Sequence, residues 1–143
     1  MKVDEELVEA RIREINDAIQ MLRGILSREY GELSIYERLS MRYLVVQLVE
    51  AASSICVHLL ISVYGERPQG YPDCFMRLGV KGVLPRGLAE RLASAARLRN
   101  LLVHRYWVID DERVYESVRR GLKDFEEFVS RIRESLKRGV GSE

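Results

Sequence analysis

Residues 99–106 read Arg99-Asn100-Leu101-Leu102-Val103-His104-Arg105-Tyr106 and end a segment whose spacing is strongly helical. At about 100° per residue, Arg99 falls inside the apolar stripe of this helix. The apolar members of the stripe are Leu88, Leu92, Ala95, Ala96, Leu102 and Val103. A guanidinium stays charged in a protein, so Arg99 must be paired or must face a polar cleft. His104 lies on another face, beside Asn100.

Arg99 and His104 are residue types that suit the cleavage of RNA without a metal. Arginine binds phosphate, and histidine gives and takes protons near neutral pH. The two positions are about 140° apart on an ideal helix, so they do not share a face. Two copies meeting at a symmetric interface would gather two of each around one groove, which favours a homodimer.

Tyr106 and Trp107 follow the histidine. We expect Tyr106 to point back to the apolar side near Leu88, so that its hydroxyl needs a cleft or a partner. Trp107 is expected to pack at the helix end. Stacking on a nucleic-acid base is the alternative for both rings.

A polar stripe crosses an otherwise apolar helix earlier in the chain. It consists of Gln47, Glu50, Ser54 and His58, and it predicts a buried network or a cleft wall. Glu50 is the natural partner for Arg99, because a carboxylate can hold a guanidinium through two hydrogen bonds. An internal salt bridge with no further role explains this pair equally well. His58 is expected to be a satisfied core or interface histidine rather than a catalytic one.

The charge of the chain is balanced overall but not along its length. The formal net charge is +1, whereas residues 81–107 hold six cations and a single acid, Glu90. The cations are Lys81, Arg86, Arg91, Arg97, Arg99 and Arg105. Such a segment suits an anionic ligand, although a solvated helix face paired with neighbouring acids has the same composition.

The hydrophobic spacing predicts an all-α, antiparallel four-helix bundle with a short extra helix. Two stripes step by 4, 3, 4, 3 and 4 residues: Val8, Ile12, Ile15, Ile19, Leu22 and Leu26, then Val118, Leu122, Phe125, Val129, Ile132 and Leu136. Ser34 and Glu37 form a capping box that starts the second helix. Asp73 is expected to cap the short helix, and Asp110 or Asp111 the last one.

Length and composition fit one soluble domain spanning residues 1–143. Two cysteines make no disulfide framework, which favours a reducing, cytoplasmic compartment with Cys56 as a buried thiol. Polar residues interrupt the apolar stretch Leu44–Ile61, so a core helix is expected there and not a membrane span. No cluster has metal-ligand spacing and no cofactor fingerprint occurs, so we expect neither a metal nor a cofactor.

The motif and its flanks resemble one family. Residues 99–106 match the pattern R-x-x-x-x-H-x-Y of the HepT-like toxins of the HEPN superfamily. The resemblance extends over most of the chain. It includes Glu50-Ala51-Ala52-x-x-Ile55, Gly65-Glu66-x-Pro68, Cys74-Phe75-x-x-Leu78-Gly79-Val80 and Tyr106-Trp107-x-Ile109-Asp110.

The resemblance implies a HEPN-like helical domain, a homodimer with the motif at the dimer cleft, and metal-independent endoribonuclease activity. It implies that Arg99 and His104 are the catalytic pair and that Asn100 helps to orient the site. It also implies a cognate minimal nucleotidyltransferase antitoxin, which neutralises the toxin by binding it and by adenylylating Tyr106.

We therefore expect the ribonuclease toxin of a type VII-like HepT/nucleotidyltransferase toxin–antitoxin pair, acting on RNA. His104 would deprotonate the ribose 2′-OH, Arg99 would stabilise the transition state, and Glu50 would orient Arg99. The alternative is a non-catalytic helical binding or regulatory subunit of a nucleotidyltransferase. Expression of the chain alone separates the two, because only a ribonuclease should poison its host.

Overall fold

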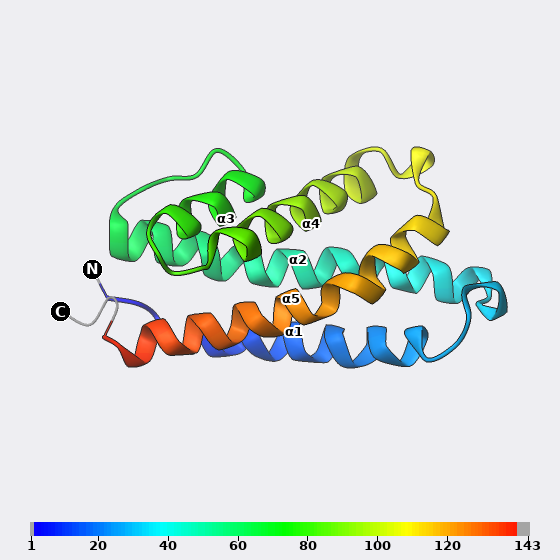
Figure 1. Cartoon of the computed structure of the whole chain (residues 1–143), viewed down its shortest axis with the longest axis horizontal. Coiled ribbons are helices and arrows are strands. Elements are labelled where there is room, and N and C mark those ends of the chain that lie inside the picture. The colour runs from blue at the N-terminus through cyan, green and yellow to red at the C-terminus, as the bar shows by residue number, and fades with distance from the viewer. Residues whose placement is uncertain (1, 140–143) are drawn as a thin grey trace.

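The computed structural model describes residues 2–139, which form five α-helices, two short 3₁₀ turns and no strand. The elements are α1 (Glu5–Leu26), η1 (Tyr30–Glu32), α2 (Ile35–Tyr64), α3 (Tyr71–Val80), α4 (Arg86–His104), η2 (Tyr106–Val108) and α5 (Asp111–Lys137). Successive long helices run in opposite directions, so that α1 begins and α5 ends at the same end of the bundle (Figure 1). The predicted all-α bundle with a short extra helix is confirmed.

Side chains cap α2 and α5 where the sequence predicts. Ser34 accepts a hydrogen bond from the Glu37 amide, and the Glu37 carboxylate accepts one from the Ser34 amide. This is the predicted capping box. Asp110, the first of the two expected caps, accepts from the Glu112 amide at 3.1 Å. α2 ends at Gly65, whose φ of 66° lies in the left-handed region that favours glycine.

α2 is the central helix of the core and contacts the other four helices. By length and composition it could cross a membrane, but 61% of its most apolar window is buried within the fold. It therefore serves as the core helix that the interrupting polar residues predict. The buried stripes of α1 and α5 consist of Val8, Ile12, Ile15, Ile19 and Leu22, and of Val118, Leu122, Phe125, Val129 and Ile132.

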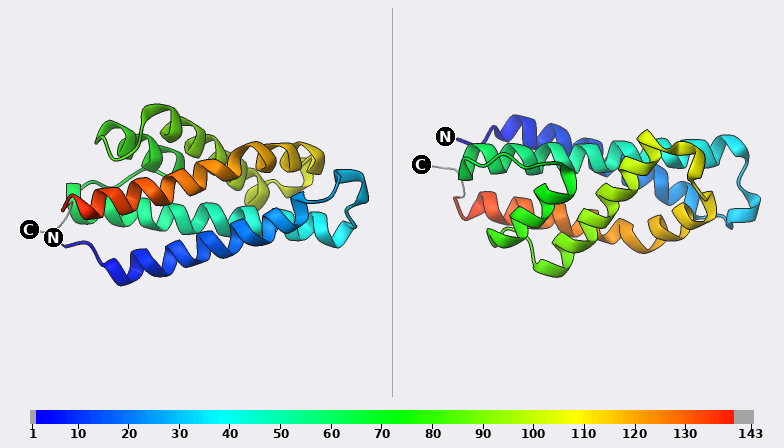
Figure 2. Two further views of the ribbon diagram at one scale, coloured as in Figure 1. Left: turned by 60° about the horizontal axis from the view of Figure 1, so that its bottom comes forward. Right: turned by 90° about the horizontal axis from the view of Figure 1, so that it is seen from above.

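α4 crosses the bundle obliquely, with α3 lying beside it (Figure 2). The end of α3 touches the first part of α4 at Gly79, where an added Cβ would lie 2.9 Å from the Cβ of Ala89. Only glycine permits this approach without a shift of one helix. The contact presses α3 onto α4, and it leaves the beginning of α3 near the second half of α4.

A disulfide joins α2 to α3, so the prediction of Cys56 as a free thiol is wrong. Cys56 and Cys74 are both fully buried, and their Cα atoms lie 6.2 Å apart. This separation is ordinary for a disulfide. The chain positions of the two cysteines do not reveal the pair, because only the packing of α3 on α2 brings them together.

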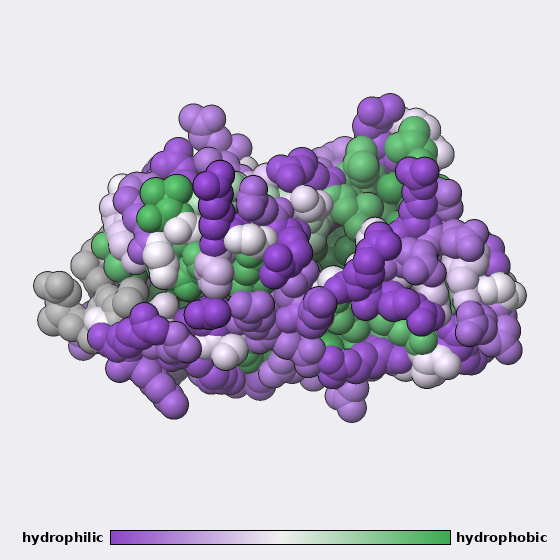
Figure 3. Space-filling view, in the orientation of Figure 1, coloured by the Kyte–Doolittle hydropathy of each residue, from purple (hydrophilic) through white to green (hydrophobic). Residues whose placement is uncertain are grey.

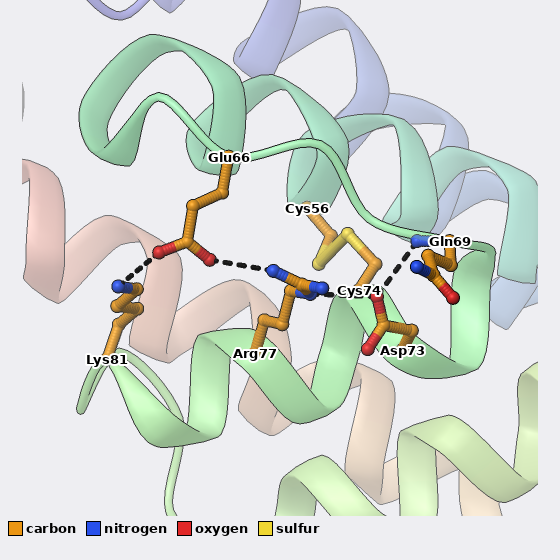
Figure 4. A network of polar contacts seen from close by, with 7 residues as sticks. All are labelled: Cys56, Glu66, Gln69, Asp73, Cys74, Arg77 and Lys81. Atoms are coloured by element: carbon orange, nitrogen blue, oxygen red, sulfur yellow. Dashed lines mark hydrogen bonds and ion pairs between the residues drawn. A yellow bond between two sulfur atoms is a disulfide. The ribbon is translucent and has the colours of Figure 1, made fainter.

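Charged side chains surround this disulfide (Figure 4). Arg77 donates to Asp73 at 2.8 Å and to Glu66 at 3.1 Å, and Lys81 forms a second ion pair with Glu66. The hydrogen bond from Lys81, followed by that from Arg77, holds the pKa of Glu66 below its ordinary value. The network fastens the loop after α2 to α3.

α3 begins earlier than the sequence indicates. Its first residue is Tyr71 and its N-cap is Gly70, so Asp73 lies inside the first turn and is not the cap. From there Asp73 accepts a hydrogen bond from the Gln69 amide at 2.8 Å, which is the main cause of its lowered pKa. The helix therefore begins at Tyr71, whose ring is half-buried and packs against the core.

Candidate active site

Arg99 lies on the core-facing side of α4 and contacts three side chains. Its Nη2 pairs with the carboxylate of Glu50, in the middle of α2. Its Nη1 donates to Asn100 Oδ1 at 2.9 Å. Its guanidinium carbon lies 5.1 Å from the centroid of the Tyr71 ring. The predicted Glu50–Arg99 ion pair is therefore formed, whereas the contact with Tyr71 has no signal in the sequence.

The surroundings of Arg99 are partly open to solvent. The Arg99 side chain is 16% exposed and that of Glu50 is 47% exposed. The Arg99 Nε is buried and has no hydrogen-bond partner in the described chain. A guanidinium carries four Nη protons, of which Glu50 and Asn100 each take one. The other two Nη protons have no acceptor within residues 2–139.

His104 is the last residue of α4 and is exposed. Within residues 2–139 its imidazole forms no hydrogen bond or ion pair, so it makes no polar contact with Arg99. The separation of the two positions around the helix thus persists in the folded chain. One copy of the chain supplies a fixed guanidinium and a free imidazole, but it does not bring them together.

Tyr106 does not point to the apolar side near Leu88, so that prediction is wrong. Arg105 takes φ −139° and ψ 45°, which ends α4 before the tyrosine is reached and places it in η2. The expectation that Trp107 packs at the helix end is also wrong, because Tyr106 and Trp107 are 62% and 67% exposed. The two rings meet edge to face with their centroids 5.4 Å apart. Both remain accessible to a partner or a base.

The polar residues of α2 do not line a single cleft, because they contact different parts of the fold. Glu50 faces Arg99, whereas Ser54 accepts from Arg11 Nε of α1 at 3.1 Å. His58 Nε2 accepts from the Asp4 amide at 2.8 Å, just before α1. His58 is thus a satisfied structural histidine, as predicted, and this half of the stripe fastens α1 to α2.

The basic segment 81–107 is partly neutralised by other helices. Its ion pairs are Lys81 with Glu66, Arg91 with Asp124, and Arg99 with Glu50. Arg86, Arg97 and Arg105 are exposed and have no ion pair in the part of the chain that the structure describes. Lys81 and Arg91 are thus neutralised at the surface, whereas Arg99 lies against the core. The three unpaired arginines form a basic surface of low charge density.

An exposed apolar surface lies beside the motif. Its members are Ile35, Tyr36, Leu39 and Tyr43 on α2, and Leu101, Val103, Tyr106, Trp107 and Val108 on α4 and η2. Figure 3 shows apolar atoms gathered over the corner formed by η2. Arg42 holds this corner in place, since it donates to the Tyr106 carbonyl at 3.2 Å and to Asp111 at 2.5 Å. Apolar side chains exposed at this density indicate an interaction surface.

A hollow of about 820 Å³ lies between α4 and α5, with an apolar floor that Figure 3 shows. Its floor includes Val45, Leu48, Val49, Ala95 and Leu98, and its rim carries Arg91, Arg119, Arg120 and Lys123. None of Glu50, Arg99 and His104 lines it. The candidate active site is therefore the open surface at the end of α4 and not this hollow. Residues 2–139 contain no group of three His, Cys, Asp or Glu placed to hold a metal ion.

Sequence comparison places most of the chain in one family. Residues 9–132 match the protein-family model described as "Ribonuclease HepT-like". A protein of Aphanizomenon flos-aquae named "tRNA nuclease HepT" is 27% identical over 138 residues, which cover 94% of this chain and 92% of that protein.

Solved structures share the fold. YutE from Bacillus subtilis, described as a cytosolic protein of unknown function, superposes with a TM-score of 0.84 at 19% identity, covering 100% of this chain and 98% of that one. The tri-AMPylated HEPN toxin of Shewanella oneidensis, solved in complex with an MNT antitoxin, has a TM-score of 0.80 at 23% identity. That match covers 90% of this chain and 97% of the toxin.

Proposed function

The chain belongs to the HepT-like ribonuclease family, and from that membership we propose how it acts, on what and with which partner. It is the toxin of a toxin–antitoxin pair and cleaves RNA without a metal ion. The observation that carries the proposal is that Glu50 and Asn100 hold Arg99 while His104 stands exposed at the end of the same helix. The relative named as a tRNA nuclease supports tRNA as the substrate.

Cleavage proceeds by attack of the ribose 2′-oxygen on the adjacent phosphorus. His104 removes the 2′-OH proton, and the guanidinium of Arg99 stabilises the extra negative charge on the phosphorane-like transition state. The P–O5′ bond breaks, and His104 of the partner subunit gives a proton to the 5′-oxygen. The products are a 2′,3′-cyclic phosphate and a free 5′-hydroxyl.

A symmetric homodimer completes this site. The exposed apolar surface on α2, α4 and η2 adjoins the motif, and a second copy of the same surface would cover it. The dimer would bring the free imidazole of one subunit toward the guanidinium of the other. The separation of the two residues within one chain is the reason that a second copy is needed.

A minimal nucleotidyltransferase is the proposed antitoxin. The exposed hydroxyl of Tyr106 is accessible to such an enzyme, and it would attack the α-phosphate of ATP and release pyrophosphate. The bulky, anionic adenylate would then repel RNA from the site. The likeness to an AMPylated toxin in complex with its MNT antitoxin supports this partner, and the likeness to YutE supports a cytoplasmic location.

The test of the proposed function is cleavage of a purified tRNA pool by the purified chain in the presence of EDTA. We expect new RNA ends that carry 2′,3′-cyclic phosphates. Light scattering should give about twice the chain mass of 16.6 kDa. Activity that is lost with EDTA and restored by a divalent ion would overturn the metal-free mechanism. A folded dimer that neither cuts RNA nor slows growth would favour a regulatory subunit of a nucleotidyltransferase.

A further inference from the structure

The ring of Tyr71 lies against the guanidinium of Arg99, with 5.1 Å between the ring centroid and the guanidinium carbon. Tyr71 is half-buried and is the first residue of α3. We propose that Tyr71 is a positioning residue, whose ring sets the tilt of the Arg99 guanidinium so that its free Nη protons face the RNA phosphate. This inference rests on the ribonuclease mechanism proposed above.

An aromatic ring suits this task better than another hydrogen-bond acceptor would. Glu50 and Asn100 each take one proton at the edge of the guanidinium. A third acceptor would take a proton that the phosphate needs, and a second carboxylate would also compete with the phosphate by charge. A ring face attracts the cation through its π electrons and takes no proton. The two edge contacts and the ring together restrain the guanidinium both in its plane and out of it.

The position of Tyr71 is fixed by the contacts that fasten α3 to its neighbouring helices. Cys74, one turn later in α3, is bonded to Cys56 of α2, the helix that also carries Glu50. At its other end α3 is pressed onto α4 by the Gly79 contact. The Tyr71 ring and the Glu50 carboxylate, which both contact Arg99, therefore belong to α3 and α2, and the disulfide joins these two helices.

The opposite end of α3 contains a matched control. Tyr64, the last residue of α2, is half-buried and has the Lys81 ammonium 5.2 Å from its ring centroid. The change Tyr64→Leu thus removes a similar ring from a similar cation contact without touching Arg99. Its effect on folding should resemble that of Tyr71→Leu.

The kinetic test compares Tyr71→Leu, Tyr71→Phe and Tyr64→Leu with the wild-type dimer in tRNA cleavage. We expect Tyr71→Leu to lower kcat about tenfold with little change in KM, because a misdirected guanidinium loses stabilisation mainly in the transition state. Tyr71→Phe keeps the ring and should keep kcat, as should Tyr64→Leu. The inference is overturned by a wild-type kcat in Tyr71→Leu, or by an equal loss of kcat in Tyr71→Phe or Tyr64→Leu.

A second measurement does not depend on activity. In a ¹⁵N-arginine NMR spectrum, the Arg99 Nε–Hε signal is the one that is absent in Arg99→Lys. This signal should shift in Tyr71→Leu because the ring current of Tyr71 is lost. It should remain in place in Tyr71→Phe and Tyr64→Leu. An unshifted signal in Tyr71→Leu would refute the placement of the ring. If the wild-type chain does not cut RNA but Tyr71→Leu still shifts the Arg99 signal, the proposed function is refuted and the placement of the ring is not.

Discussion

Arg99 and His104 stand five residues apart on α4 and have opposite surroundings. Arg99 contacts a carboxylate, an amide and an aromatic ring from α2, α4 and α3, and its side chain is 16% exposed. His104 is exposed and has no polar partner within residues 2–139, and η2 beyond it carries two exposed rings. A single chain thus orients Arg99, the proposed phosphate-binding group, but leaves His104, the proposed proton-transfer group, free.

Arg99 acquires its surroundings by folding, whereas we propose that His104 acquires its own by assembly of two subunits. Contacts that hold Arg99 form when α2, α3 and α4 pack, so they exist in one subunit. We propose that His104 receives its neighbours only from a second subunit and from the RNA. Changes at His104 should therefore alter activity without altering stability, whereas changes around Arg99 should alter both.

The largest expected effect is that of His104→Ala on cleavage. Loss of a general acid–base group typically costs about two to four orders of magnitude in rate. Because the His104 side chain is exposed and unpartnered in the described chain, the denaturant midpoint and the dimer mass should stay unchanged. Single-turnover cleavage of tRNA and urea unfolding measure the two effects. Cleavage at the wild-type rate would refute the proposed role of His104 in proton transfer. A large loss of stability would show that His104, like Arg99, contributes to folding.

The next effect concerns the disulfide that joins α3 to α2. The bond closes a loop with a sequence separation of 18, which corresponds to about 3 kcal/mol of unfolding free energy in the chain-entropy estimate. Urea unfolding of the wild-type chain with and without a reductant should show this loss. The double change Cys56→Ala with Cys74→Ala should reproduce it and should become insensitive to the reductant. Equal stability in both conditions would mean that the bond adds nothing to the unfolding free energy.

The smallest effect is that of Glu50→Ala, which removes the acid partner of Arg99. A fully buried guanidinium left without its partner costs about 3–5 kcal/mol, but Glu50 is 47% exposed, so we expect about 1 kcal/mol in unfolding free energy. We also expect about a tenfold loss of kcat, since a lost electrostatic contact of this size changes the barrier to that extent. Glu90→Ala, at an exposed acid of α4 that has no ion pair within residues 2–139, is the control and should change neither quantity. An unchanged kcat in Glu50→Ala would mean that the ion pair is purely structural.

Much of the fold could be read from the chain because helices are specified locally. The capping box at Ser34, the cap at Asp110 and the apolar stripes of α1 and α5 depend on residues a few positions apart. The errors occurred where local rules compete. Helical spacing alone placed Tyr106 on the apolar side, but α4 ends at His104, and the short helix begins at Tyr71 and not after Asp73.

Local patterns in the sequence are enough to specify the helices, the motif of residues 99–106 and the pairing of Arg99 with Glu50. An arginine inside an apolar stripe demands a partner, and only one carboxylate interrupts the apolar helix α2 at a suitable place. Tertiary structure alone decided the Cys56–Cys74 bond and the contact of Tyr71 with Arg99. These contacts join residues far apart in the chain, and they depend on how α3 packs between α2 and α4, which no local spacing encodes.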